Sequence, residues 1–110
     1  MLKVHKTWGN ELWVVNREYC GKILNINKDA QCSLHYHLLK DETFYLLEGK
    51  IKLKYGKQER IMNKGDVHHI KQGVLHRFKG LEDSVLIEFS THHLDSDSYR
   101  IEESRSKKCH

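Results

Sequence analysis

His35-Tyr36-His37, then Glu42, then Gly49 form the stretch that decides the fold of this chain and points to its chemistry. Residues i and i+2 of a β-strand project from the same face, so the two histidines should stand side by side. Glu42 lies beyond a short turn, at the start of the next apolar run. The spacing therefore predicts two neighbouring strands that bring two imidazoles and one carboxylate together.

A second segment punctuated by glycines adds a third histidine, because Gly65 and Gly73 precede His76. Any single histidine among the nine in this sequence could be incidental, but the ordered combination is hard to reach by chance. We therefore predict one divalent-metal site with these ligands: His35, His37, Glu42 and His76. Three nitrogens and one oxygen suit a transition metal such as Mn, Zn, Fe, Ni or Co, and the ligand set does not choose among them. Metal affinity should fall as pH drops through the histidine range, near ~6.5.

Short apolar stretches separated by turn residues recur along the chain. They predict strands over residues 12–16, 19–26, 32–38, 42–48, 50–55, 58–62, 67–70, 74–79 and 84–91. Proline is absent, so glycine, asparagine and aspartate provide the turns. No long segment has a helical period, and only residues 94–99 could form one helical turn. The pattern predicts an all-β sandwich or barrel.

The composition indicates one domain, since 110 residues are near the common domain size. We expect the domain to span residues 1–103, with a disordered polar tail over 104–110. The sequence has no apolar run long enough for a membrane span and no apolar core of a secretory signal, so we expect a cytoplasmic protein. The three cysteines have no paired spacing and are expected to be reduced thiols.

The net charge of +4 does not indicate a nucleic-acid partner. Much of the excess lies in residues 100–108 and in Lys50, Lys52 and Lys54, which alternate with apolar residues as on the solvated face of a strand. Basic residues are not interleaved with aromatic ones as base stacking requires. We therefore expect a small-molecule ligand, no nucleic acid and no membrane.

The strand predicted over residues 32–38 carries its histidines on one face and apolar side chains on the other. The outward apolar set is Leu34, Tyr36 and Leu38. Cys32 has the same parity and should face away from His35. An apolar face of this extent should not stay exposed to water. We expect the N-terminal strand or a second copy to cover it, and we favour a homodimer.

The ordered residues resemble the two sequence motifs of the cupin superfamily. The first motif is matched by His35, His37, Glu42 and Gly49. The second is matched by Gly65, Gly73 and His76. The departures are Asp29, Lys71 and Gly80, which replace a glycine, a proline and an asparagine and affect turns rather than ligands. The resemblance implies a single-domain double-stranded β-helix, the jelly-roll barrel of the cupins.

A narrower resemblance covers about residues 5–103 and is to type II mannose-6-phosphate isomerase domains. The matching segments are residues 5–11, which contain Trp8-Gly9, and residues 32–37, 40–42, 73–77, 86–88 and 95–100. In those domains the position of His35 is often glutamine. His35 makes the site more similar to a general cupin metal centre and to the cupin-type sugar isomerases.

This resemblance implies a metal-dependent sugar or sugar-phosphate isomerase that interconverts an aldose and a ketose through a metal-stabilised enediol. Such chemistry needs a base that moves a proton between adjacent carbons. Glu88, in the apolar run 85–89, is the candidate base, although strand alternation does not settle which way it faces. Three cations are candidates for binding the sugar or its phosphate: Lys40, Arg77 and Arg100.

Two other functional classes remain open. Three histidines and one glutamate also suit an Fe(II)-dependent dioxygenase, which metal identity and oxygen consumption would distinguish. A non-catalytic sugar-binding module would have no base within reach of the site. His92 and His93 follow the last predicted strand and are expected to be exposed loop residues, with a role next to the ligands as the alternative.

Overall fold

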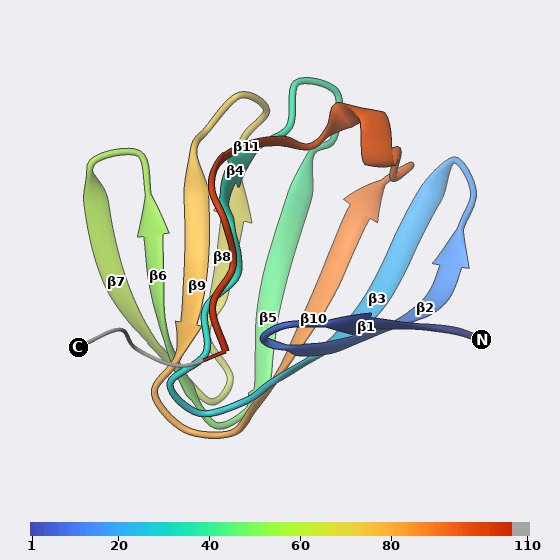
Figure 1. The fold of residues 1–110 in the computed structure, drawn as a ribbon. Helices are drawn as coiled ribbons and strands as arrows, with labels where there is room; N and C mark the ends of the chain where they lie inside the picture. Colours follow the sequence, from blue (N-terminus) through green and yellow to red (C-terminus); the bar gives the residue numbers. More distant parts are fainter. Residues whose placement is uncertain (107–110) are drawn as a thin grey trace.

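Two antiparallel β-sheets face each other in the computed structural model, which describes residues 1–106 (Figure 1). The six-stranded sheet contains, in spatial order, β1 (Leu2–Lys6), β2 (Gly9–Asn16), β3 (Tyr19–Ile26), β10 (Ser84–Thr91), β5 (Glu42–Glu48) and β8 (Val67–Ile70). The five-stranded sheet contains β11 (Tyr99–Glu102), β4 (Leu34–Tyr36), β9 (His76–Gly80), β6 (Lys50–Tyr55) and β7 (Gln58–Asn63). The all-β, double-sheet architecture predicted from the sequence is confirmed.

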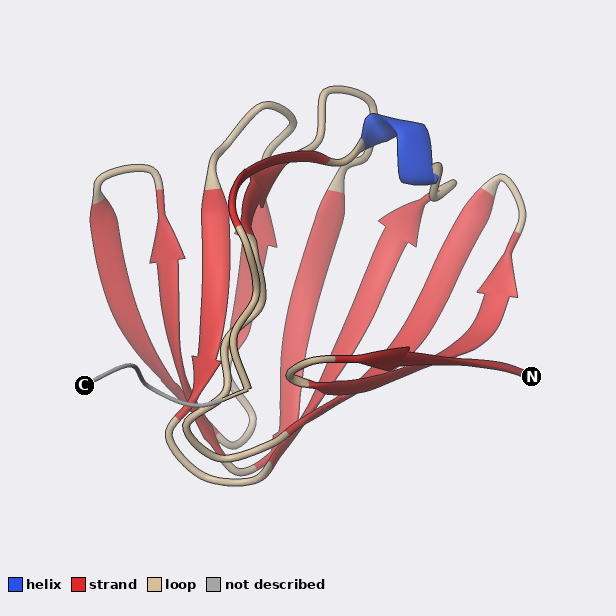
Figure 2. Ribbon diagram, viewed as in Figure 1, coloured by secondary structure: helices blue, strands red, loops and turns tan. Residues whose placement is uncertain are grey.

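The helix content also agrees with the prediction, because the described residues contain one short 3-10 helix, η1 (Asp95–Asp97), and otherwise strands and loops (Figure 2). Five strands, β3, β5, β6, β8 and β10, have the bounds predicted from alternation. The sequence did not predict β1 or β11, two short strands whose residues are largely exposed. Within residues 1–106, no helix is long and apolar enough to cross a membrane.

The inner faces of the sheets carry apolar side chains at one end of the barrel and titratable side chains at the other. On β10 the inward residues are Leu86 and Glu88, and the register places Leu86 opposite Leu24 and Leu46. Two positions along, Glu88 lies opposite Lys22. The same change occurs on β9, where Phe78 belongs to the apolar core and His76 does not. The strands therefore build an apolar core at one level of the barrel and a polar site at the next.

Two expectations, one about an apolar surface and one about the C-terminal boundary of the domain, need correction. Leu34 is already buried within the single chain, and Tyr36 stacks on Tyr99 of β11 with ring centroids 5.0 Å apart, so only Leu38 of the outward set remains exposed. That face gives no argument for a homodimer. Arg105 forms a bridge with Gln31, so the structured chain continues past the predicted boundary at 103. The rest of the predicted tail, residues 107–110 with Cys109, lies outside the described residues.

Gly49, between β5 and β6, is a position where only glycine fits. Its φ is +89°, and a Cβ added there would lie 2.5 Å from the carbonyl oxygen of Asp83. Gly56 has a φ of +57° but no neighbour within 4 Å of such a Cβ. We expect Gly49→Ala to lower the free energy of unfolding by about 3 kcal/mol and Gly56→Ala by about 1 kcal/mol, since only Gly49 combines backbone strain with a clash. Urea unfolding measures both, and equal losses would show that the clash does not matter.

Candidate metal centre

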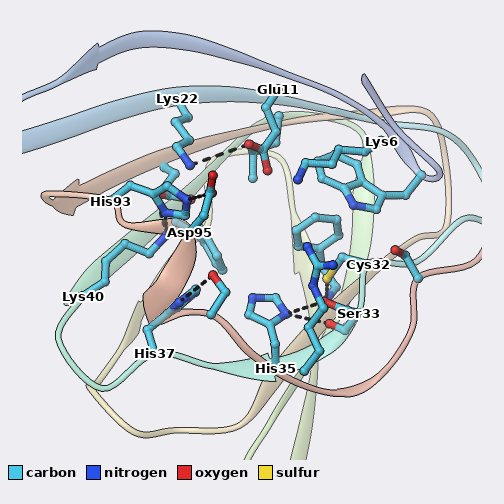
Figure 3. A pocket seen from close by; sticks show the side chains of 18 residues that line it. Lys6, Glu11, Lys22, Cys32, Ser33, His35, His37, Lys40, His93 and Asp95 are labelled. Atoms are coloured by element: carbon cyan, nitrogen blue, oxygen red, sulfur yellow. Dashed lines mark hydrogen bonds and ion pairs between the residues drawn. The ribbon is translucent and has the colours of Figure 1, made fainter. Parts of the chain in front are cut away.

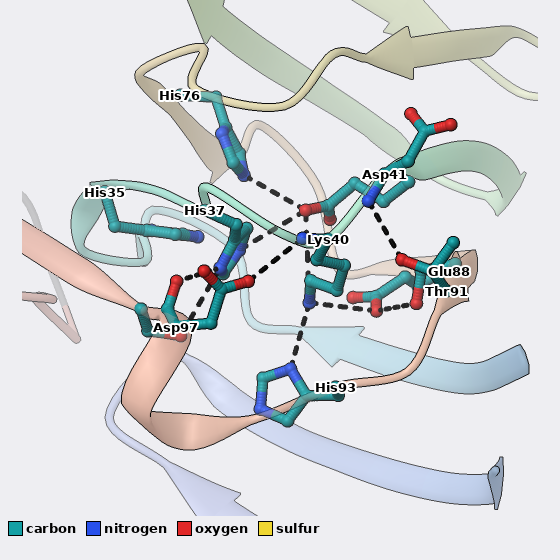
Figure 4. A network of polar contacts seen from close by, with 12 residues as sticks. His35, His37, Lys40, Asp41, His76, Glu88, Thr91, His93 and Asp97 are labelled. Atoms are coloured by element: carbon teal, nitrogen blue, oxygen red, sulfur yellow. Dashed lines mark hydrogen bonds and ion pairs between the residues drawn. The ribbon is translucent and has the colours of Figure 1, made fainter. Parts of the chain in front are cut away.

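Three histidines converge at the polar end of the barrel. His35 lies on β4 directly opposite His76 on β9, and His37 follows β4. Ligand nitrogens of the three side chains all lie within 4.8 Å of one another. Figure 4 shows the imidazoles of His35, His37 and His76 turned toward one another. The structure therefore brings together the three histidines that the sequence singled out.

Backbone carbonyls fix the tautomer of each imidazole. The Nδ1 atoms lie 2.7 Å from the carbonyl oxygen of Ser33 for His35, 3.1 Å from that of Asp97 for His37, and 2.8 Å from that of Val74 for His76. A carbonyl oxygen only accepts, so each Nδ1 carries the proton and donates. Each Nε2 is then left with a free lone pair, as in metal-binding histidines oriented by a backbone acceptor.

Glu42, the first residue of β5, completes the set. Its Oε2 lies 3.3 Å from Nε2 of His37 and 3.7 Å from Nε2 of His76. Both Oε2 of Glu42 and Nε2 of His76 are buried without a hydrogen-bond partner among the described residues. Buried polar atoms without a partner are costly, and two that face one another need a shared partner. A divalent cation has the charge and ligand preference to satisfy both, so the residues present fit a metal.

Burial sets the protonation of the four groups. It lowers the pKa of His37 to about 3 and that of His76 to about 4, with Lys40 acting in the same direction. The pKa of His35 also falls well below its ordinary value, through burial and the neighbouring His76. Burial and Glu88 raise the pKa of Glu42. The imidazoles are therefore neutral near pH 6.5, and Glu42 holds the proton that a metal must displace. This corrects the expectation that the histidines titrate there.

Glu88 faces inward, which the sequence had left open. Its Oε2 lies 3.2 Å from Nζ of Lys40 and accepts a hydrogen bond of 2.9 Å from Oγ of Ser90. Burial acts to raise the pKa of Glu88, but Lys40 and Lys22 outweigh it and lower the pKa below its usual range. Glu88 is thus an ionised carboxylate in the barrel interior.

Lys40 is the centre of a chain of polar contacts. Besides Glu88, its Nζ lies 3.1 Å from Nδ1 of His93 and 3.9 Å from Oε2 of Glu42. His93 in turn lies 2.9 Å from a carboxylate oxygen of Asp95. His93 is half-buried and in contact with the site, which agrees with the alternative interpretation that it lies next to the ligands. His92 is exposed, as expected.

The short helix η1 clamps the loop between His37 and Glu42. The carboxylate of Asp97 accepts hydrogen bonds from the backbone N–H groups of Leu38, Leu39 and Lys40, at 2.9, 3.0 and 3.0 Å. The carbonyl of the same residue accepts from His37. Asp97 thus positions one ligand directly and a second through the loop. The sequence showed the segment 95–100 but not this role.

A cavity of about 480 Å³ opens beside the histidines, within the size range of small-molecule sites. Lys40 and Arg100 line it, as does Glu88. Arg77 does not, because it alternates with the inward residues of β9 and faces the outer side, where its Nε donates to the carbonyl of Cys32 at 2.8 Å.

Two other lining residues were not anticipated by the sequence analysis. Cys32 lines the cavity, because it precedes the regular part of β4 and strand parity does not apply to it. Lys22 also lines it, and the alternation of β3 contains the signal: Lys22 shares its face with the apolar Leu24. Figure 3 shows Lys22 on the wall across from His35 and His37.

Comparison with known proteins agrees with this geometry. A family model described as "Cupin domain" matches residues 22–90. A search of curated proteins found no match.

Solved structures share the fold. KdgF from Halomonas sp. has a TM-score of 0.74 and 19% identity, with 79% of this chain and 81% of that one covered. A sugar phosphate isomerase of the cupin superfamily from Silicibacter pomeroyi has a TM-score of 0.68 and 22% identity, with 76% and 59% covered. The capsular polysaccharide assembling protein CapF from Staphylococcus aureus has a TM-score of 0.80 and 20% identity, with 92% of this chain covering 34% of that one. At these identities the likeness shows a shared fold alone.

Removal of a ligand should remove the metal. We expect the purified protein to contain about one divalent metal per chain and both His35→Ala and His76→Ala to retain less than about a tenth of it, because each variant loses one of few ligands. Elemental analysis checks the content. His5→Ala is the matched control, since this exposed histidine lies on β1, a strand that carries none of the proposed ligands. Full occupancy in both site variants would refute the assignment.

Proton release on metal binding tests the charge states. Calorimetry of zinc binding at pH 6.0 in buffers of different ionisation enthalpy should show about one proton released, from Glu42. Histidines with pKa values near ~6.5 would together release about two more. Glu42→Gln should bind zinc more weakly and release almost no proton. Release of more than two protons by the wild-type protein would contradict the assigned charge states.

Proposed function

This chain belongs to the cupin family, and from that premise we propose that it is a metal-dependent isomerase that interconverts an aldose and a ketose. The observation that carries the proposal is Glu88, an ionised carboxylate that lines the same cavity as His35 and His37. A divalent metal at His35, His37, Glu42 and His76 would supply a Lewis acid that polarises oxygens of the substrate.

The chemistry needs no oxidant or reductant. Aldose–ketose interconversion moves one proton between adjacent carbons and one between the two oxygens they carry. Glu88 accepts the proton from the carbon beside the carbonyl and returns it to the neighbouring carbon. Lys40 holds the Glu88 carboxylate in place at 3.2 Å and keeps it ionised, which is the form that accepts a proton. Glu42 and Glu88 have pKa values shifted in opposite directions, as expected for two carboxyls with different roles.

The proposed substrate is a small sugar or sugar phosphate. The cavity volume, the resemblance to type II mannose-6-phosphate isomerase domains and the structural likeness to a sugar phosphate isomerase support this class. Arg100, which lies opposite His35 on β11, is a cation available to the substrate. Lys40 lines the cavity but is engaged by Glu88 and His93, and Arg77 lies on the other face of its sheet.

We also propose a homodimer, on a face other than the one the sequence indicated. The register of the six-stranded sheet aligns apolar residues across five of its strands on the outer face: Leu12, Ile23, Ile87, Tyr45 and Val67. Val67 and the neighbouring Phe89 are more than half exposed. A row through the middle of a sheet can pack against its own copy about a two-fold axis. Light scattering at micromolar concentration checks the mass, and a monomer would refute the proposal.

Solvent deuterium exchange tests the reaction. We expect exchange at carbon 2 of mannose 6-phosphate or at carbon 1 of fructose 6-phosphate when the protein is supplied with Mn, Zn or Fe(II). Glu88→Gln should lower the exchange rate by ~10²–10⁴-fold while the metal content stays unchanged, because only the base is lost. Glu18→Gln, at an exposed position, is the control.

Other results would assign a different class. No exchange with any sugar, together with oxygen uptake by the Fe(II) form, would identify a dioxygenase. Sugar binding without exchange or oxygen uptake would identify a binding module.

A further inference from the structure

Lys22 is a buried ammonium at the polar end of the barrel. It lies on the inward face of β3 and is only 2% exposed. A buried charge is costly unless it is paired and hydrogen-bonded.

The protein satisfies Lys22 only in part. Its Nζ lies 3.6 Å from a carboxylate oxygen of Glu11 and 4.2 Å from the centre of the Trp13 ring. The same Glu11 oxygen already accepts a hydrogen bond of 2.9 Å from Nε1 of Trp13. An ammonium has three donors, and within residues 1–106 none of the hydrogen bonds is donated by Nζ of Lys22.

Lys40, by contrast, is a buried lysine whose ammonium group has hydrogen-bond partners within the protein. It is equally buried, but its Nζ donates to Glu88 at 3.2 Å and lies 3.1 Å from His93. The register places Lys22 directly opposite Glu88 on β10, yet Glu88 pairs with Lys40 instead. Lys22 is therefore the buried cation of this site that keeps donors for another molecule.

The free donors face the cavity. Lys22 and Glu11 lie on the wall across from His35 and His37 in Figure 3, and Lys6 lies beside Glu11. Arg100 also lines the cavity. Across the whole cavity, four lysine and arginine side chains outnumber three carboxylates, because Glu88 and Asp95 also line it. Glu88 is paired with Lys40 and Asp95 with His93, so the lining as a whole favours a negatively charged group over a neutral one.

We infer that Lys22 binds the anionic group, a carboxylate or a phosphate, of a ligand whose other end lies at the histidines. The ligand class is an anionic sugar, and this inference deepens the proposed function by naming the charge of the substrate and the residue that recognises it. A charge-assisted hydrogen bond to an anion is about twice as strong as one to a neutral hydroxyl. Of the three cations expected from the sequence to do this, Lys40 is already paired and Arg77 faces the opposite side. Arg100 lines the cavity but is exposed, so lacking a partner costs it less than it costs Lys22.

Calorimetry with the zinc-loaded protein tests the inference, using glucose, glucuronate and glucose 6-phosphate as neutral, carboxylate and phosphate probes. We expect one of the two anions to bind at least about tenfold tighter than glucose, which corresponds to about 1.4 kcal/mol. Whichever anion is preferred identifies the group. Lys22→Met and Lys22→Gln should abolish the preference and leave glucose affinity within about twofold, whereas Lys22→Arg should retain most of it. Lys57→Met, at an exposed turn, is the matched control.

The outcomes are separable from those of the isomerase proposal, because binding requires no turnover. A preference that depends on Lys22 in a protein without deuterium exchange would support the anion site and remove the isomerase. No preference in the wild-type protein, or an unchanged preference in folded Lys22→Gln, would overturn the inference. Zinc content and thermal unfolding of each variant establish that it is folded. Two neutral replacements of different polarity, Lys22→Met and Lys22→Gln, keep the test possible if one of them does not fold.

Discussion

The register between β10 and its two neighbours is the constraint on which the rest of this structure depends. Leu86 lies opposite Leu24 and Leu46, and Glu88 lies opposite Lys22. A slip of one residue would turn Glu88 outward and place Ile87 at the polar level, because side chains of a strand alternate between its faces. The boundary between core and site is therefore set by strand pairing, and each buried charge is placed at the level of its partners.

Several charges are buried together at that level, and their arrangement explains their states. Lys40 lies between Glu88 and Glu42, closer to Glu88, so Glu88 stays ionised while burial favours the protonated form of Glu42. The imidazoles are held neutral by the same burial, with their protons committed to backbone carbonyls. A site of this kind has ligands in the right form for a cation and a carboxylate ready to accept a proton.

Three groups of residues line or adjoin the same cavity. In the proposed function the histidines and Glu42 hold a metal and Glu88 transfers a proton, and in the further inference Lys22 binds a negative charge on the ligand. Asp97 supports both the metal ligands and the candidate base, because it fixes the loop that carries Lys40 and leads into Glu42. An enzyme that binds an anionic sugar between a Lewis acid and an ammonium is the simplest protein that uses all of these groups.

The sequence by itself determined the all-β fold, the bounds of five strands and three histidines that meet in space. These depend on alternation and on the spacing between neighbouring strands, which are local properties of a chain. Tertiary structure alone decided that Glu88 faces inward, that Arg77 does not, and that Asp97 clamps a loop some sixty residues away. It also decided that Lys40 donates a hydrogen bond to Glu88, whereas Lys22 only forms a longer ion pair with Glu11. Those outcomes depend on which distant side chain lies close enough to pair with a buried charge, and on how burial shifts a pKa. Neither is encoded in the periodicity of a single strand.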